Sequence, residues 1–273
     1  MQRLLDALTG RSEDDPGLDR AALELARIEY PGLDAGPFLA VLDSHAHALS
    51  QRLAGGTRGA HYVEAANQYL FGELGFTGNS GNYYDPRNSC LNEVLTARTG
   101  IPITLAVVYL EIGRRLGQPL CGIGLPGHFL VEYRDADFAA FIDVFHAGRL
   151  LTAAECFALA REAAGVPMRD DPRMLARASQ RQILTRMLNN LRGVYLHRRE
   201  FGKALQTLDL MVAADPSSAE PYRQRGLVHL QMQKPAAARG DLETYLRLAP
   251  DGFGREDIEK RLRALRSYQA QLN

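Results

Sequence analysis

Residues 88–145 decide the fold, and they read NSCLNEVLTARTGIPITLAVVYLEIGRRLGQPLCGIGLPGHFLVEYRDADFAAFIDVF. The stretch begins with Asn88 and Ser89, two residue types that often precede a helix. Cys90 follows, and the apolar residues after it have helical spacing up to Gly100. Cys90 is therefore predicted in the first turn of a helix. Unpaired backbone N–H groups there favour negative charge, so we expect a lowered thiol pKa and a nucleophilic thiolate.

A second helix and three strands fill the rest of the stretch. Residues 102–116 begin with proline, end before Gly117 and carry an apolar stripe, which predicts a buried helix. Three β-like runs follow, at 120–125, 128–133 and 139–145, and the first two are separated by a Pro-Gly turn.

Two polar residues, His128 and Asp143, lie on the second and third of these runs. If Asp135 and Ala136 form the centre of a hairpin turn, residue i lies opposite residue 271 − i, which places His128 directly across from Asp143. Opposed side chains share a face, with Cβ atoms roughly 4.5 to 5.5 Å apart, so the carboxylate could orient the imidazole. The other face would be apolar and pack on the helices, with Phe129, Val131, Tyr133, Ile142 and Val144.

Each residue of this set also has a structural interpretation. A cysteine is often a small packed residue, and His128 could tie the preceding Pro-Gly bend. Asp143 is more telling, because a carboxylate in an apolar strand is costly without a partner, and His128 is the obvious one. The backbone N–H of Cys90 is the expected first donor to an oxyanion.

Several longer strings strengthen the pattern. They are Leu70–Asn79 (LFGELGFTGN), Tyr83–Leu95 (YYDPRNSCLNEVL), Gly100–Leu105 (GIPITL) and Gly124–Val131 (GLPGHFLV). Over nearly the whole chain the sequence resembles the bacterial SirB-type family, whose members join a transglutaminase-like domain to tetratricopeptide repeats and are often labelled regulators of SirC expression. The resemblance implies a papain-like order of site residues, with Cys90 as nucleophile, His128 as general base and Asp143 as the residue that orients it.

The totals bound the class of protein. Lys plus Arg equals Asp plus Glu, at 32 each, so no net field argues for nucleic acid or an acidic membrane surface. No apolar run is long enough to span a bilayer and the N-terminus has no leader pattern, so we expect a cytoplasmic protein. The three cysteines, Cys90, Cys121 and Cys156, are expected as reduced thiols. Neither a metal nor a cofactor is expected, and the spacing of His45 and His47 suits a shared ligand role poorly.

The fold class we expect is α+β: a papain/transglutaminase-like core with an N-terminal helical cover, followed by an all-α repeat segment. Helical patterns at 18–30, 36–54 and 62–74 form the cover, and residues 152–165 begin with a Thr-x-x-Glu capping box. The predicted division is 1–166 for the transglutaminase-like domain, 167–174 for a linker and 175–273 for the repeats.

The C-terminal part repeats with a period of 34 residues. Ala204 recurs as Ala238, Leu208 as Leu242, and Asp215-Pro216 is echoed by Ala249-Pro250, a spacing typical of tetratricopeptide repeats. Helices at 175–184 and 255–272 are expected to cap the two copies.

Two functions from different classes fit these patterns. The first is a cysteine hydrolase or acyltransferase acting on a protein or peptide amide, with the repeats choosing the protein partner. The second is a non-catalytic adaptor, in which the transglutaminase-like domain is a scaffold. A protein or peptide partner is expected in both cases.

Overall fold

The computed structural model describes residues 2–9, 17–53, 55–165, 169–252 and 254–272. The chain divides into two compact units, residues 1–190 and 191–273, so the division falls within helix α8 (Gln180–His197). The linker predicted at 167–174 is earlier than this division. Residues 167 and 168 lie outside the described residues, and the remainder belongs to the first unit.

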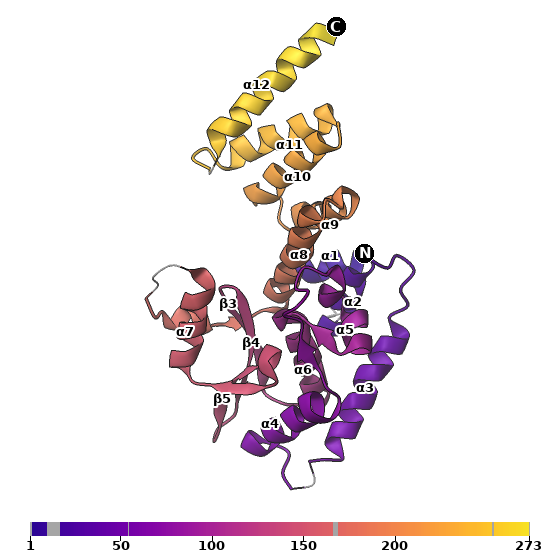
Figure 1. The fold of residues 1–273 in the computed structure, drawn as a ribbon, viewed down its shortest axis with the longest axis vertical. Helices are drawn as coiled ribbons and strands as arrows, with labels where there is room; N and C mark the ends of the chain where they lie inside the picture. The colour runs from indigo at the N-terminus through magenta and orange to yellow at the C-terminus, as the bar shows by residue number, and fades with distance from the viewer. Residues whose placement is uncertain (1, 10–16, 54, 166–168, 253, 273) are drawn as a thin grey trace. The chain divides into compact units, whose positions relative to one another are not determined.

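The first unit begins with helices and continues into a sheet (Figure 1). Its first helices are α1 (Gln2–Thr9), α2 (Leu18–Ala26), α3 (Gly36–Ser50) and α4 (Gly59–Asn67), and a π-helix, Gln68–Glu73, continues α4. A 3₁₀ turn (Pro86–Ser89) leads into α5 (Leu91–Ala97), and α6 (Pro102–Arg115) follows. Two short strands, β1 (Thr77–Gly78) and β2 (Thr99–Gly100), pair in parallel beside them. The helical cover and the buried helix are thus where the sequence predicts them.

The main sheet has five antiparallel strands in the order β6-β5-β4-β3-β7. The strands are β3 (Leu120–Leu125), β4 (His128–Arg134), β5 (Ala139–Asp143), β6 (Arg149–Leu151) and β7 (Arg177–Ala178). Val131 pairs with Ile142 and Arg134 with Ala139, so residue i faces residue 273 − i. The predicted register between β4 and β5 is therefore wrong by two residues.

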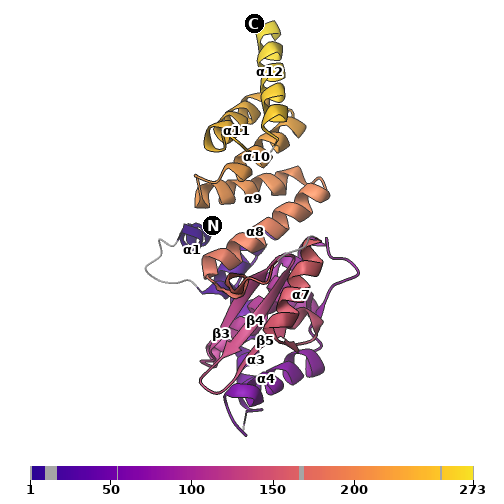
Figure 2. The same cartoon turned by 90° about the vertical axis from the view of Figure 1, so that its left-hand side faces the viewer.

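One helix covers each face of this sheet. Phe129, Val131 and Tyr133 alternate along β4 and are buried on the face that packs against α6. On the opposite face, Ile123, Leu125 and Leu130 form a core with Cys156 and Ala160 of α7 (Ala153–Ala164). Figure 2 shows β3, β4 and β5 side by side with α7 over them. Thr152 begins α7 through the capping box that the sequence predicts, since its Oγ1 accepts a hydrogen bond from Glu155 N–H.

Buried charge holds the helical cover on α6. Arg115 of α6 donates from Nη2 to Asp19 of α2 at 2.6 Å and from Nε to Asp43 of α3 at 2.6 Å. Arg115 Nη1 also reaches Oε2 of buried Glu111 at 2.9 Å. Burial raises the pKa of Glu111, although the neighbouring arginines act against this shift. The network orients α2 and α3 around the helix that underlies the sheet.

Two predicted element boundaries are wrong. The Cys90 helix does not run to Gly100: it ends at Ala97, because Arg98 takes the left-handed conformation with φ 57°. In place of a helix over 175–184, the chain forms a 3₁₀ turn (Pro172–Leu175) and then β7 before α8 begins at Gln180. β7 has only two residues, which is too short for a periodicity signal.

The second unit is helical, as the sequence predicts. After α8 come α9 (Phe201–Ala214), α10 (Ala219–Gln231), α11 (Pro235–Leu248) and α12 (Arg255–Leu272). Gly226 of α10 lies against α11, since a Cβ at this position would be 2.7 Å from Cδ2 of Leu242. The small residue lets the two helices approach closely. None of the described helices is long and apolar enough to cross a bilayer.

The turns between paired helices repeat the backbone geometry at an interval of 34 residues. Arg199 and Gln233 both have positive φ, 59° and 55°. Glu200 N–H donates to Tyr195 O at 2.9 Å, and 34 residues later Lys234 N–H donates to His229 O at 2.9 Å. The sequence period therefore corresponds to a period in backbone hydrogen bonding.

Candidate functional site

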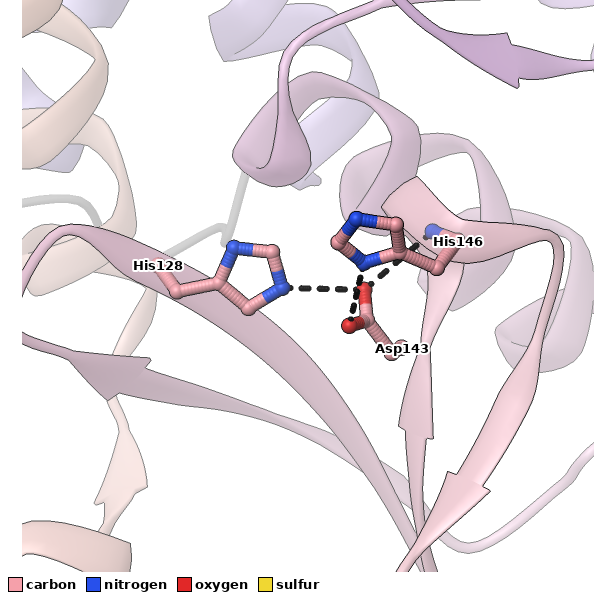
Figure 3. A group of neighbouring side chains, drawn as sticks. All are labelled: His128, Asp143 and His146. Carbon is pink, nitrogen blue, oxygen red and sulfur yellow. Dashed lines mark hydrogen bonds and ion pairs between the residues drawn. The ribbon is translucent and has the colours of Figure 1, made fainter. Parts of the chain in front are cut away.

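The candidate site forms where β4 begins and β5 ends. His128 is the first residue of β4 and Asp143 is the last residue of β5. Nε2 of His128 lies 2.9 Å from Oδ1 of Asp143, and Figure 3 shows the imidazole and carboxylate facing one another. The structure thus brings together two of the three residues that the sequence singles out.

This contact forms although the two residues are not directly opposed. The turn between β4 and β5 spans Asp135 to Phe138, whose ends are joined by a 3.0 Å hydrogen bond from Asp135 N–H to Phe138 O. The longer turn shifts the register by two residues, and an even shift leaves each side chain on its predicted face. Asp143 therefore keeps the same face as His128 and lies diagonally from it, within reach of a long side chain.

His146 is a third member of the cluster, and sequence reasoning missed it. Its Nδ1 lies 2.7 Å from Oδ2 of Asp143, so the carboxylate is held between two imidazoles (Figure 3). His146 belongs to a 3₁₀ turn, Val144–His146, where β5 was predicted to continue to Phe145. In a strand His146 would have faced away from Asp143. A histidine three residues after a buried aspartate was the available signal.

Asp143 is 1% exposed and is satisfied by four hydrogen bonds. Besides the two rings, the backbone N–H groups of Phe145 and His146 donate to Oδ1 at 3.2 and 3.3 Å. Burial by itself would raise the pKa of Asp143, but the hydrogen bonds and charge from His128 and His146 outweigh it, and the pKa is lowered. The carboxylate is therefore ionised at neutral pH and fixes which nitrogen of each ring carries a proton.

Cys90 lies elsewhere. It is the residue before α5, is 0% exposed, and its thiol donates to the carbonyl oxygen of Pro86 at 3.4 Å. It lies near Tyr30, whose pKa is raised to about 12 by burial first, then by Glu93, and in smaller part by Cys90. His128 makes its side-chain hydrogen bond to Asp143 and none to Cys90. The catalytic roles of the three residues stay a prediction, and the structure does not bring Cys90 into the His128–Asp143 pair.

The expected oxyanion donor is also in use. The backbone N–H of Cys90 donates to Arg87 O at 3.1 Å inside the 3₁₀ turn. Asn88 is buried and its side chain fixes the neighbouring loop, donating to Asn82 O at 2.7 Å and accepting from Asn79 at 3.0 Å. These groups shape the loop before α5, and none of these hydrogen bonds leaves the Cys90 N–H for a substrate oxygen.

A pocket of about 600 Å³ adjoins the start of β4. Pro102 and Ile103 at the start of α6 form one wall, the β3–β4 turn around Gly127 forms another, and His128 and Arg186 also line it. Gly127 has φ 67°, and a Cβ there would be 2.5 Å from Cβ of Ala163, so the turn requires glycine. No cysteine, serine, threonine or lysine lines this pocket. It therefore lacks the side chains that usually act as nucleophiles.

Comparison with known proteins places the chain in a family. A family model described as "Transglutaminase-like superfamily" matches residues 37–189, and a tetratricopeptide-repeat model matches residues 191–263. The UPF0162 protein of Xylella fastidiosa (strain 9a5c) is 38% identical over 250 residues, which are 90% of this chain and 89% of that protein. The chain belongs to the transglutaminase-like superfamily and to the UPF0162 family.

More distant UPF0162 and eukaryotic proteins share the same sequence. The UPF0162 protein PA3419 of Pseudomonas aeruginosa is 30% identical over 250 residues, which are 92% of this chain and 90% of that protein. The human F-box only protein 21 is 32% identical over 171 residues, which are 58% of this chain and 26% of that protein. The UPF0162 matches support the combination of a transglutaminase-like domain with repeats over the whole chain.

The two-histidine cluster of this UPF0162 protein has the donor set of a metal site. The ligand atoms of His128, Asp143 and His146 lie within 4.8 Å of one another, and imidazole with carboxylate suits a divalent metal such as zinc. In the present arrangement both carboxylate oxygens already accept hydrogen bonds from the rings. A bound metal would have to replace both of these protons, so the cluster is satisfied as a hydrogen-bonded unit.

Proposed function

We propose that the protein is a non-catalytic adaptor of the regulatory kind that the SirB-type resemblance suggests. In this proposal the transglutaminase-like unit presents its pocket to a peptide and the repeats bind a protein partner. One observation carries it: the pocket beside His128 has no side chain of the usual nucleophilic types, and Cys90 is buried near Tyr30. The His128–Asp143 pair then acts as a structural clasp between two strand ends.

The repeats supply a natural partner surface in this proposal. Arg192 of α8 is partly buried, and its Nε makes no hydrogen bond to any residue in the described ranges. Burial lowers the pKa of Arg192, and Glu220 of α10 acts against the shift. A buried donor with no acceptor is costly in an isolated chain, so this groove is suited to a partner that supplies one.

A second candidate is the cysteine hydrolase or acyltransferase. The 2.9 Å contact between His128 and Asp143 favours it, because an oriented imidazole is what a general base requires. In that reaction Cys90 Sγ attacks the carbonyl carbon of an amide, His128 takes the thiol proton and delivers it to the leaving amine, and water then hydrolyses the thioester. The thiol would first have to leave its contact with Pro86.

Iodoacetamide labelling across pH 6 to 8, read by mass spectrometry, separates the two functions. The adaptor proposal expects Cys90 in the native protein to react more slowly than a free thiol of pKa about 8.5. Rapid labelling at pH 6 that His128→Ala abolishes would contradict the adaptor proposal and support the enzyme. Cys121 is an internal reference, since burial first, and then Glu132, raise its pKa to about 12.

Complementation in a strain that lacks its own copy tests the adaptor directly. We expect Cys90→Ser to complement fully and Arg192→Glu to fail. Arg247→Glu on exposed α11 is the matched control for the charge change and should complement. Loss of complementation by Cys90→Ser in a protein with unchanged thermal stability would overturn the proposal. We place this function in the cytoplasm, since Cys90, Cys121 and Cys156, all within the described residues, form no disulfide.

A further inference from the structure

The pocket beside the start of β4 contains a cation and no anion. It is bounded by the first turn of α6, by Gly124 and Phe129 of the β3–β4 hairpin, and by Arg186 of α8. None of its lining residues is aspartate or glutamate. The lining thus carries a positive charge that no acidic residue of the pocket offsets.

Arg186 is held in place by two contacts. Its Nη2 donates to the carbonyl oxygen of His128 at 2.7 Å, and its guanidinium carbon lies 5.5 Å from the centre of the Phe129 ring. Within the described ranges, Nε and Nη1 donate no hydrogen bond and no carboxylate lies within ion-pair distance. The guanidinium is therefore oriented in advance, with donors still available.

Burial makes this arrangement costly without a ligand. The pKa of Arg186 is lowered because burial disfavours its charge, and Tyr83 acts against the shift. A guanidinium that is partly removed from water and has no carboxylate partner loses solvation that an anion would restore. Arginine also binds carboxylates through two parallel hydrogen bonds, which suits its two available donor positions.

The surrounding backbone leaves room for an anion and favours it. At Gly124 a Cβ would lie 3.3 Å from Nη1 of Arg186, closer than ordinary contact, so glycine preserves the space beside that donor. Ile103 is the second residue of α6, and the helix begins after Ile101 with no side-chain cap. The first N–H groups of α6 and the helix dipole add positive potential to that of Arg186.

The walls around this charge are suited to a peptide. Leu125, Phe129 and Met174 give the pocket an apolar part, and the amide side chains of Asn189 and Asn190 give it a polar edge. Tyr83 also lines it and stacks edge-on against Tyr84 at 5.7 Å, and both tyrosines are exposed. Exposed tyrosine and oriented arginine are residue types enriched where proteins bind other proteins.

We propose that this pocket binds the carboxylate side chain of an aspartate or glutamate in an extended segment of a partner protein, with Arg186 as the recognition residue. An apolar residue next to the acidic one fills the part of the pocket near Phe129. This inference rests on the proposed adaptor function and names the chemistry that the transglutaminase-like unit recognises.

The test selects binders from a display library of random linear peptides on the full-length protein. With the wild type, we expect enriched sequences to share one acidic position beside an apolar residue. With Arg186→Met, which keeps an unbranched side chain but removes the charge, we expect the acidic position to be lost. Arg181→Met, an exposed arginine on the same helix, is the matched control and should preserve it. Circular dichroism melting checks that each variant is folded, and Arg186→Gln is a second neutral variant.

Calorimetry then measures the most enriched peptide against a copy in which glutamine or asparagine replaces the acid. We expect roughly tenfold weaker binding of the amide copy, the loss typical of a charge-assisted hydrogen bond, and equal binding of both copies by Arg186→Met. Enrichment without an acidic position, an acidic preference that survives in Arg186→Met, or no enrichment at all would each overturn the inference. None of these results decides the adaptor function, which stands or falls on complementation.

Discussion

Replacing Asp143 by asparagine should destabilise the first unit by about 2 kcal/mol at neutral pH. The amide fits the same space, and its oxygen can still accept from His128 and from the backbone N–H groups that Oδ1 serves. The loss is the charge that strengthens the two imidazole hydrogen bonds. Hydrogen bonds to charged groups contribute about 1.5 to 3 kcal/mol and neutral ones about 0.5 to 1.5, so about 1 kcal/mol is lost at each ring.

The pH dependence of this effect follows from the lowered pKa of Asp143. Between its folded-state pKa and the ordinary value of 3.8, the unfolded chain binds a proton that the folded chain does not. The stability that Asp143 contributes is therefore complete above about pH 4 to 5 and is lost as pH falls through the folded-state pKa. The difference between wild type and Asp143→Asn should be the same at pH 7 and pH 5 and should shrink toward pH 3.

Urea unfolding followed by far-UV circular dichroism is the assay, because the chain contains no tryptophan. Asp137→Asn, the same substitution at an exposed turn position, is the control and should change stability by no more than about 0.5 kcal/mol. Equal stability of Asp143→Asn and wild type at pH 7 would refute the account of the clasp. So would a difference that stays constant down to pH 3.

Three further results are expected. Gly127→Ala should cost about 3 kcal/mol in urea unfolding, because it adds a clash with α7 to a left-handed backbone, whereas Gly117→Ala, with φ 64° and no atom near its Cβ, should cost about 1; equal costs would contradict the clash. In the second unit, Gly226→Ala should destabilise by about 1 to 3 kcal/mol through close helix contact, while Gly240→Ala, with open space around it, should stabilise by up to about 1. Dialysis against EDTA should leave the unfolding midpoint unchanged, since hydrogen bonds already satisfy Asp143, and a midpoint that falls and is restored by zinc would show a metal at the two-histidine cluster.

Long periodic elements of the fold were predictable from sequence. The strand over 120–125 and the helix from Pro102 have the predicted limits to within one residue, because an apolar stripe and strong Pro and Gly signals act together there. The end of α5 was not predictable in the same way. The chain turns at Arg98, a residue that rarely adopts positive φ, and tertiary contacts override the weak preference.

The site was predictable in part. The partnership of His128 with Asp143 follows from the cost of a buried carboxylate, which does not depend on exact register. The position of Cys90 depends on which side of a short 3₁₀ turn the thiol faces, and residue spacing does not determine that. Arg186 and the pocket also required the structure, since they join residues far apart in the chain.

The left-handed turns at Arg199 and Gln233 bear on how such arrays diverge. Two long polar residues occupy a conformation that glycine adopts without strain, at a cost of roughly 1 kcal/mol each. The duplicated segments have thus kept a main-chain trajectory while letting the amino acid at its tightest point drift. Aligning the copies by side chain would score arginine against glutamine and overlook their kinship, whereas superposing the connecting loops would reveal it.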